Sequence, residues 1–188
     1  MHLGQIDQYP ERVSTQIILR SGEEVLLRPL RKDDAPMLGA YFLGLSVATT
    51  RVYGPHQFDQ QTADRLCAEL DSADTLRMLG IVERGSQQRI IAYFIVHFGI
   101  YESDAKRYRD RNMLLSSTSD CELAPSVADG DQNTGVGSLV MEHLMPLLRR
   151  VGRKGGRGVA VGVLGAEAAQ ETATLARLGG GRRCRWRR

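Results

Sequence analysis

The sequence predicts an α+β protein with a mixed, mostly antiparallel central sheet flanked by helices. Two β-rich runs surround the turn Ser21-Gly22, and two more surround the polar turn at residues 84–88. Short polar turns between β-rich runs are typical of antiparallel hairpins. Other segments have apolar residues at helical spacing. At 188 residues the chain is long enough for one domain with a sizeable core.

The first half of the chain predicts a hairpin followed by two helices. The hairpin strands are TQIILR and EEVLLRPLR. Asp33 is the expected N-cap of the first helix, Asp59 is the expected N-cap of the second, and residues 45–58 are expected to form the loop between them. The apolar faces of the two helices hold Leu38, Tyr41, Phe42 and Leu45, and then Ala63, Leu66, Cys67 and Leu70.

The second half predicts a meander and a third long helix. The strand over residues 89–99 is apolar on both faces, which favours a central place in the sheet. The charged residues 101–118 are an excursion, and the strand TSDCELAPSVAD follows. Pro125 would remove a ladder hydrogen bond, so we expect a bulge or a splayed strand there. A helix is predicted from Gly135 to about Arg150, with a kink at Pro146.

Charge is distributed unevenly along the chain. The net charge is +3, but residues 152–188 carry nine basic and two acidic residues, whereas residues 1–151 carry 16 basic and 20 acidic ones. The acidic body disfavours a nucleic-acid partner. No apolar run reaches the roughly 20 residues of a membrane span, so we expect no membrane partner and a cytoplasmic location. The three cysteines form no CxxC pair, which disfavours a zinc site and a disulfide framework.

The segment QNTGVG, residues 132–137, stands between a strand and a helix. The first N–H groups of a helix lack intrahelical acceptors, and the helix dipole is positive at that end. With glycines that permit close approach, such a turn is an anion site suited to phosphate or pyrophosphate. A plain turn is the alternative. The Walker and dinucleotide-binding motifs do not match, because the lysine of the first and the third glycine of the second are absent.

QNTGVG matches the pattern Gln/Arg-x-x-Gly-x-Gly/Ala and follows the last strand of a meander. Together with LLRPLRKDDA and CELAPSVAD, it makes residues 16–155 resemble the GNAT superfamily of acyl-CoA N-acyltransferases. The resemblance implies transfer of an acetyl group from acetyl-CoA to a primary amine of a small molecule or protein, by direct attack in a ternary complex and without a metal. A CoA-binding module with little or no activity is the alternative.

The resemblance also implies roles for residues. The loop amides would hold the CoA pyrophosphate, with Gln132 at the loop entrance. Pantetheine would lie along Pro125, Ser126 and Val127, and the Val127 amide would donate to the thioester carbonyl. The residues expected to contact CoA are therefore Pro125, Ser126, Val127, Gln132, Asn133, Thr134, Gly135, Val136, Gly137 and Ser138.

A general base is required, because an amine must lose a proton when it attacks a thioester. Glu122 occupies the position of such a base in the family, although an exposed strand-start glutamate is an equal alternative; Asp120 is a weaker candidate. A covalent mechanism at Cys121 lacks an identifiable histidine partner. His97 is expected to be a core histidine. Tyr53 and His56 either line the acceptor site or only pack.

The segment 156–188 departs from the family. No tyrosine follows Tyr108, so the general acid that the family has in this region is not assigned. The last strands of the fold are expected to be missing or altered. Either a change of reading frame near residue 155 produced this Gly/Ala/Arg-rich tail, or the tail is genuine. A genuine tail would remain unfolded or would pair with a second chain in a homodimer.

Overall fold

A computed structural model describes residues 3–52, 55–110, 112, 114–152 and 159–160. One sheet runs through it, in the order β1-β2-β3-β4-β5-β6. Neighbouring strands are antiparallel up to β5, and β6 is parallel to β5. The predicted mostly antiparallel sheet is therefore confirmed. The strands are β1 (Thr15–Ile18), β2 (Glu24–Pro29), β3 (Thr75–Arg84), β4 (Gln87–His97), β5 (Glu122–Val127) and β6 (Val159–Ala160).

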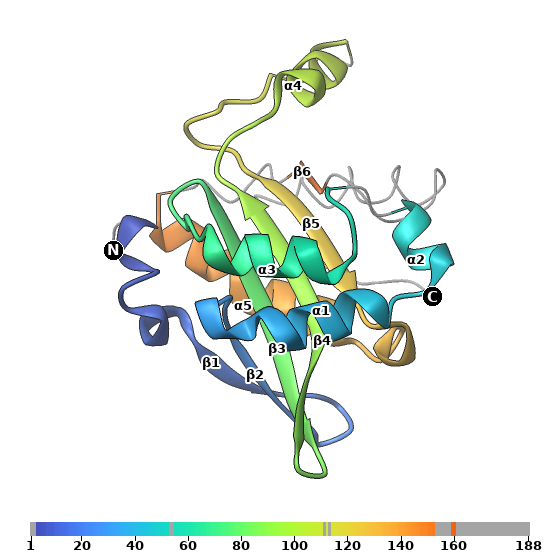
Figure 1. Cartoon of the computed structure of the whole chain (residues 1–188). Helices are drawn as coiled ribbons and strands as arrows, with labels where there is room; N and C mark the ends of the chain where they lie inside the picture. The colour runs from blue at the N-terminus through green and yellow to red at the C-terminus, as the bar shows by residue number, and fades with distance from the viewer. Residues whose placement is uncertain (1–2, 53–54, 111, 113, 153–158, 161–188) are drawn as a thin grey trace.

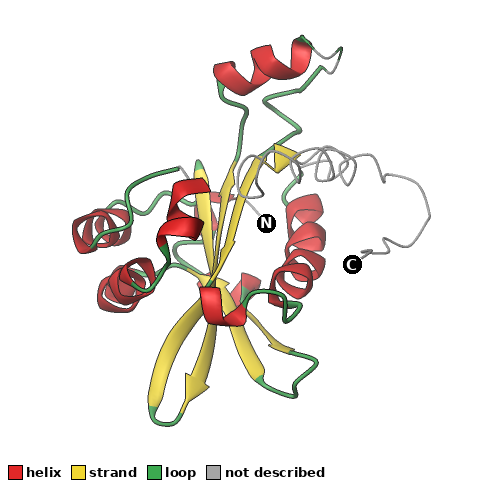
Figure 2. Cartoon of the chain, turned by 90° about the vertical axis from the view of Figure 1, so that its right-hand side faces the viewer, coloured by secondary structure: helices red, strands yellow, loops and turns green. Residues whose placement is uncertain are grey.

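Helices cover both faces of this sheet. α1 (Ala35–Leu43) and α3 (Gln60–Ala68) lie on one face, and α5 (Val136–Arg150) lies on the other (Figure 2). The short α2 (Val47–Val52) precedes α3, and α4 (Glu102–Arg109) stands on the excursion between β4 and β5, away from the sheet (Figure 1). The described part of the chain has no helix long and apolar enough to cross a membrane.

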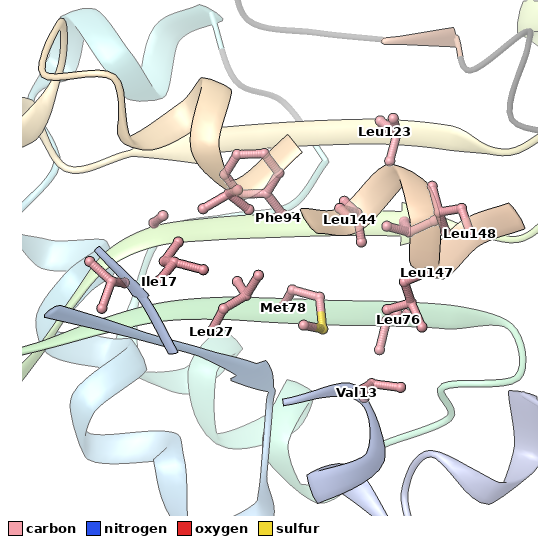
Figure 3. Packing of buried hydrophobic residues seen from close by; sticks show 14 of the residues in the cluster. Val13, Ile17, Leu27, Leu76, Met78, Phe94, Leu123, Leu144, Leu147 and Leu148 are labelled. Carbon is pink, nitrogen blue, oxygen red and sulfur yellow. The ribbon is translucent and has the colours of Figure 1, made fainter. Parts of the chain in front are cut away.

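Two hydrophobic layers result, one on each side of the sheet. Tyr93 and Phe94 are neighbours on β4, yet they belong to opposite layers and are both almost fully buried. This confirms that β4 is a central strand, because an edge or half-exposed strand would leave one of them in water. On the α5 side, Phe94 and Met78 of the sheet face Leu144 of the helix (Figure 3).

The two expected helix caps have different outcomes. Asp59 caps α3, because its Oδ1 accepts a hydrogen bond of 2.7 Å from the Thr62 N–H. Asp33 does not cap α1. Asp34 precedes that helix and forms a buried ion pair with Arg28 of β2, at 2.6 Å. The expected loop over residues 45–58 also needs correction, because residues 47–52 form α2.

Pro125 causes no bulge in the ladder between β4 and β5. The two strands pair residue for residue, from Ala92–Val127 to His97–Glu122. The only irregular step described for these ladders lies between β3 and β4, next to Gly80. On the far side, β6 pairs only with Glu122 and Leu123, so the described part of β6 leaves the rest of that edge uncovered. The expected bulge is therefore wrong for the β4–β5 ladder, and a splay on the β6 side stays a prediction.

Geometry explains why the proline is tolerated. The Ala128 N–H donates to the Ile91 carbonyl of β4, at 2.9 Å. Because successive N–H groups of a strand point to opposite edges, position 125 points its nitrogen away from β4. The N–H that Pro125 lacks would have faced the β6 side, so no hydrogen bond to β4 is lost.

Candidate functional site

The loop between β5 and α5 has two residues in the left-handed region. Asn133 has φ +62° and Gly135 has φ +92°. Gly135 is the N-cap residue, and α5 begins at Val136 as predicted within one residue. A side chain would be strained at this φ, so the turn itself requires a glycine at position 135.

The start of α5 presents unpaired backbone donors. The first hydrogen bond of the helix runs from the Leu139 N–H to the Gly135 carbonyl, at 3.0 Å. The N–H groups of Val136, Gly137 and Ser138 therefore have no acceptor within the helix. No atom lies within 4 Å of where a Cβ on Gly135 would stand. Unpaired donors beside open space, at the positive end of a helix, form a geometry that receives an anion.

An ion-pair cluster anchors this loop to the hairpins. Arg84, at the end of β3, contacts Asp131 at 2.6 Å and Glu23 at 2.8 Å. Within the loop, the Thr134 hydroxyl donates to the Asp131 carbonyl at 2.6 Å. Asp131 is buried, and its charge is paired with Arg84 rather than directed at the helix start. Asp131 therefore stabilises the loop, and because Arg84 neutralises its charge it does not repel an anion at the start of α5.

A second cluster ties the loop to α2. Asp129 accepts hydrogen bonds of 2.7 Å from the Ser46 N–H, the Ser46 hydroxyl and the Thr49 hydroxyl. The bond from Thr49, followed by those from Ser46, lowers the pKa of the Asp129 carboxyl. The Gln132 side chain donates to the Thr49 hydroxyl and to the Val127 carbonyl, both at 3.2 Å. Gln132 thus bridges the loop, α2 and the end of β5.

Val127 presents its backbone to the edge of β5 that faces away from β4. Since Ala128 directs its N–H to β4, the N–H and C=O of Val127 point to the opposite edge. The Gln132 amide contacts this Val127 carbonyl, which agrees with that direction. The Val127 N–H therefore points to the side where an extended ligand could add as a further strand.

Side chains of β5 alternate between the two layers. Ala124 packs in the α1/α3 layer, whereas Cys121 and Leu123 pack in the α5 layer. Glu122, two residues before Ala124 on the same strand, is therefore also on the α1/α3 face. Cys121 is buried among apolar side chains on the other face, which argues against a nucleophilic role beside Glu122.

Glu122 is only 6% exposed, so the alternative of an exposed glutamate is wrong. Its Oε1 accepts a hydrogen bond of 2.8 Å from the Tyr101 N–H. Asp120 is also buried, but its Oδ2 accepts from the Ser116 N–H at 2.8 Å, within its own turn. Of the two carboxylates, Glu122 is the one on the sheet face, and Asp120 organises the excursion.

Polar and aromatic groups surround Glu122. His97 is its cross-strand partner on β4, and the His97 ring stacks on Tyr101 with centroids 4.3 Å apart. His97 Nδ1 lies 3.3 Å from the Thr75 hydroxyl and 3.6 Å from an Asp74 oxygen. The expectation of a core histidine is therefore wrong, because His97 ends the apolar run of β4 in a polar cluster at the rim of the sheet.

A second aromatic group lies on the same face, nearer to α1. His56 Nε2 is 3.2 Å from the Tyr93 hydroxyl, and its ring packs against Phe42 and Phe58. Burial lowers the pKa of His56 below its ordinary value. His56 thus packs among aromatic side chains, which is one of the two roles predicted for it. Tyr53, the other loop residue in that prediction, lies outside the described residues.

Three residues of this face were not identified from the sequence as site candidates. The Tyr41 hydroxyl of α1 shares a hydrogen bond with the Ser126 hydroxyl of β5. Tyr93 of β4 pairs with Ser126 of β5, so both side chains lie on this face. Arg77 of β3 pairs with Ile95, which in turn pairs with Ala124, so Arg77 lies on this face as well. Tyr41 was predicted only as a core residue, and no local pattern pairs residues so far apart. The excess of polar residues on a buried sheet face was the one available signal.

The remaining predictions concern metals and the tail. Among the residues that the structure describes, no group of three or more His, Cys, Asp or Glu side chains is arranged to hold a metal ion. Residues 161–188, where the general acid of the family would be sought, lie outside the described part of the chain.

Comparisons with known proteins connect this geometry with a fold family. Neither a protein-family model nor a curated protein matches the sequence. The GNAT domain of S. lividans PAT matches the structure with a TM-score of 0.65 and 20% identity, over 89% of each chain. A variant of the cAMP-binding acyltransferase from Mycobacterium smegmatis matches with a TM-score of 0.50 and 21% identity, over 89% of this chain and 45% of that one. The chain thus spans less than half of the mycobacterial protein. It has the GNAT acyltransferase fold, as the sequence predicted.

Proposed function

We propose that the protein transfers an acetyl group from acetyl-CoA to a primary amine by direct attack in a ternary complex. The observation that carries the proposal is the start of α5. Three N–H groups without helical acceptors lie beside the left-handed Gly135, where a Cβ would meet open space, and they follow a strand that pairs on its far edge only at Glu122 and Leu123 among the described residues. This combination suits a ligand that has both a pyrophosphate and an extended amide-bearing arm.

The residues at the site fit coenzyme A part by part. The amides from Asn133 to Ser138 would hold the pyrophosphate. The uncovered edge of β5 would pair with the pantetheine amides as an added strand. The Val127 N–H, which points to that edge, would donate to the thioester oxygen as negative charge develops there. Acetyl-CoA, when bound, supplies the activated carbonyl carbon.

Glu122 would act as the general base. It lies on the α1/α3 face, opposite the α5 layer, and its Oε1 is held by the Tyr101 N–H. In this role the carboxylate takes the proton that the attacking amine loses, either directly or through a water. The neighbouring His97 is in register with Glu122 and faces the same side of the sheet. Its ring offers a route by which that proton reaches solvent.

Isothermal calorimetry with acetyl-CoA, followed by a thiol-release assay over a panel of amines, tests the proposal. We expect binding of acetyl-CoA and release of free CoA with at least one amine. Binding without turnover on any amine would instead identify a CoA-binding module. Absence of acetyl-CoA binding would reject the proposed function altogether.

A further inference from the structure

Arg77 is a positive charge on the face of the sheet that carries Glu122. It lies on β3 in the row formed with Ile95 and Ala124, next to the row formed by Thr75, His97 and Glu122. Cross-strand partners share a face, so the Arg77 side chain extends toward α1 and α3 rather than toward α5. On this face it is close to both aromatic groups of the site.

Electrostatic effects on neighbouring groups agree with this location. Burial raises the pKa of Tyr93, and the charge of Arg77 together with its hydrogen bond opposes that rise. Burial and then the charge of Glu122 raise the pKa of Tyr101, and Arg77 opposes them. Tyr101 is therefore within range of both Glu122 and Arg77. The guanidinium and the carboxylate act on one small region.

No protein carboxylate pairs with Arg77 among the ion pairs of the described residues. Its Nη1 makes a long hydrogen bond, 3.4 Å, to the Thr75 carbonyl, and the guanidinium also interacts with the Tyr93 hydroxyl, but neither partner carries a charge. Its Nε is buried and has no hydrogen-bond partner. A partly buried charge with no carboxylate partner among the described residues is unfavourable, and a carboxylate that reaches the Nη groups would supply the missing counter-charge.

We propose that Arg77 binds a carboxylate of the acyl acceptor, so that the acceptor is a small amino acid-like molecule rather than a polyamine or a plain amine. This inference rests on the proposed acetyl transfer. It adds the substrate class, which the fold does not specify, and it makes Arg77 a specificity-determining residue.

Spacing across the sheet sets the size of this acceptor. Arg77 and Glu122 are two strands apart and two residues apart along the strand direction, which separates their Cα atoms by about 12 Å. Both side chains extend from the same face and shorten the gap between their charged ends. A molecule whose amine and carboxylate are only a few bonds apart has the length to bridge them, with its amine on the Glu122 side and its carboxylate at Arg77.

The test compares matched acceptors and matched variants in the full-length protein. Free amino acids and the corresponding amino acid amides, together with putrescine and a lysine-containing peptide, are assayed by CoA release. Arg77→Met removes the charge at similar length, and Arg77→Lys keeps the charge without the planar fork. Arg89→Met, at an exposed position on β4, is the control. Calorimetry with acetyl-CoA and thermal unfolding are measured for each variant.

We expect the wild type to prefer the free amino acids to their amides. Arg77→Met should lower kcat/KM for the free amino acids by roughly ten- to a hundredfold, chiefly through KM. The amides should change far less, and Arg77→Lys should recover part of the loss. Because each amine serves as its own reference, differences in amine reactivity cancel in the ratio between wild type and variant.

Three results would overturn the inference. One is turnover of putrescine, the peptide or the amides with no turnover of any free amino acid. Another is an equal loss for acids and amides in Arg77→Met when acetyl-CoA affinity and unfolding temperature are unchanged. The third is a similar loss in Arg89→Met. The first two leave the proposed acetyl transfer intact, whereas failure to bind acetyl-CoA would reject that function itself.

Discussion

At the scale of single residues, Glu122 is distinguished from the other carboxylates by its surroundings. It is buried on a sheet face, it accepts from the Tyr101 N–H, and it stands opposite His97. A glutamine at position 122 has nearly the same shape as glutamate, and its amide oxygen can still accept the hydrogen bond from the Tyr101 N–H. The substitution therefore removes the charge and keeps this hydrogen bond. This separates the chemistry of Glu122 from its packing.

The variant Glu122→Gln should reduce kcat by roughly 100- to 10,000-fold, because the base that accepts the amine proton is lost. Acetyl-CoA affinity, measured by calorimetry, should stay within about twofold. An unaltered rate across the pH range would remove Glu122 as the base.

His56 gives a pH dependence to stability. Burial is the main cause that lowers its pKa below the ordinary value of 6.5. Between the folded and unfolded pKa values the unfolded chain binds more protons, so the free energy of unfolding decreases as the pH falls below 6.5. This contribution is fully present above pH 6.5 and is lost as the pH approaches the folded value.

Urea unfolding at several pH values between 5 and 7.5 checks this sign. His56→Gln should flatten the decrease below pH 6.5, because the titrating group is gone. His143 is an exposed histidine whose Nδ1 lies 2.9 Å from the Leu139 carbonyl of its own helix, so His143→Gln is the matched control and should leave the slope unchanged. Equal slopes in both variants would show that another group is responsible.

At the scale of elements, the β5–loop–α5 unit depends on one left-handed residue. Gly135→Ala should destabilise the protein by about 1–2 kcal/mol, because an L side chain is strained at φ +92°. It should also weaken acetyl-CoA binding, because the strain turns the N–H groups at the start of α5. Urea unfolding and calorimetry measure the two effects.

Gly130 provides the control within the same loop. A Cβ there would meet no atom within 4 Å, and its φ is not left-handed. Gly130→Ala should therefore change neither stability nor affinity by more than the error of the measurement. If Gly135→Ala behaves like Gly130→Ala, the loop conformation described for Gly135 is not the one that binds.

At the scale of the whole molecule, the sheet is shared by two hydrophobic layers. Leu144 on α5 and Leu38 on α1 are both fully buried, one in each layer. Since β4 contributes to both layers, loss of either one exposes the same strand. The folded body should therefore unfold as one cooperative unit rather than as two.

Leu144→Ala and Leu38→Ala should each lower the free energy of unfolding by about 2–5 kcal/mol. Each variant should still give a single transition, with the same midpoint by fluorescence and by far-ultraviolet circular dichroism. Leu43 on α1 is 69% exposed, and Leu43→Ala should stay within about 0.5 kcal/mol of wild type. Two separated transitions in either core variant would contradict a shared core.

Local patterns were sufficient for most elements. The hairpins, the burial of β4, the Asp59 cap and the start of α5 follow from periodicity and turn chemistry, which depend on a few neighbouring residues. Patterns were less reliable where a partner outside the element intervenes, whether it lies on the preceding strand or far along the chain. Asp34 forms an ion pair with Arg28, and Ser46 and Thr49 at the start of α2 bind Asp129, some 80 residues away.

The candidate site divides in the same way. The sequence by itself determined the sheet class, the strand that carries Glu122 and the glycine at the left-handed turn, because each depends on local conformation. Only the tertiary structure decided that Glu122 is buried beside His97 and Tyr101, that the nitrogen of Pro125 points away from β4, and that Arg77 has no carboxylate partner among the described residues. The physical reason is that burial, strand register and charge pairing are set by contacts between distant segments, which no local pattern encodes.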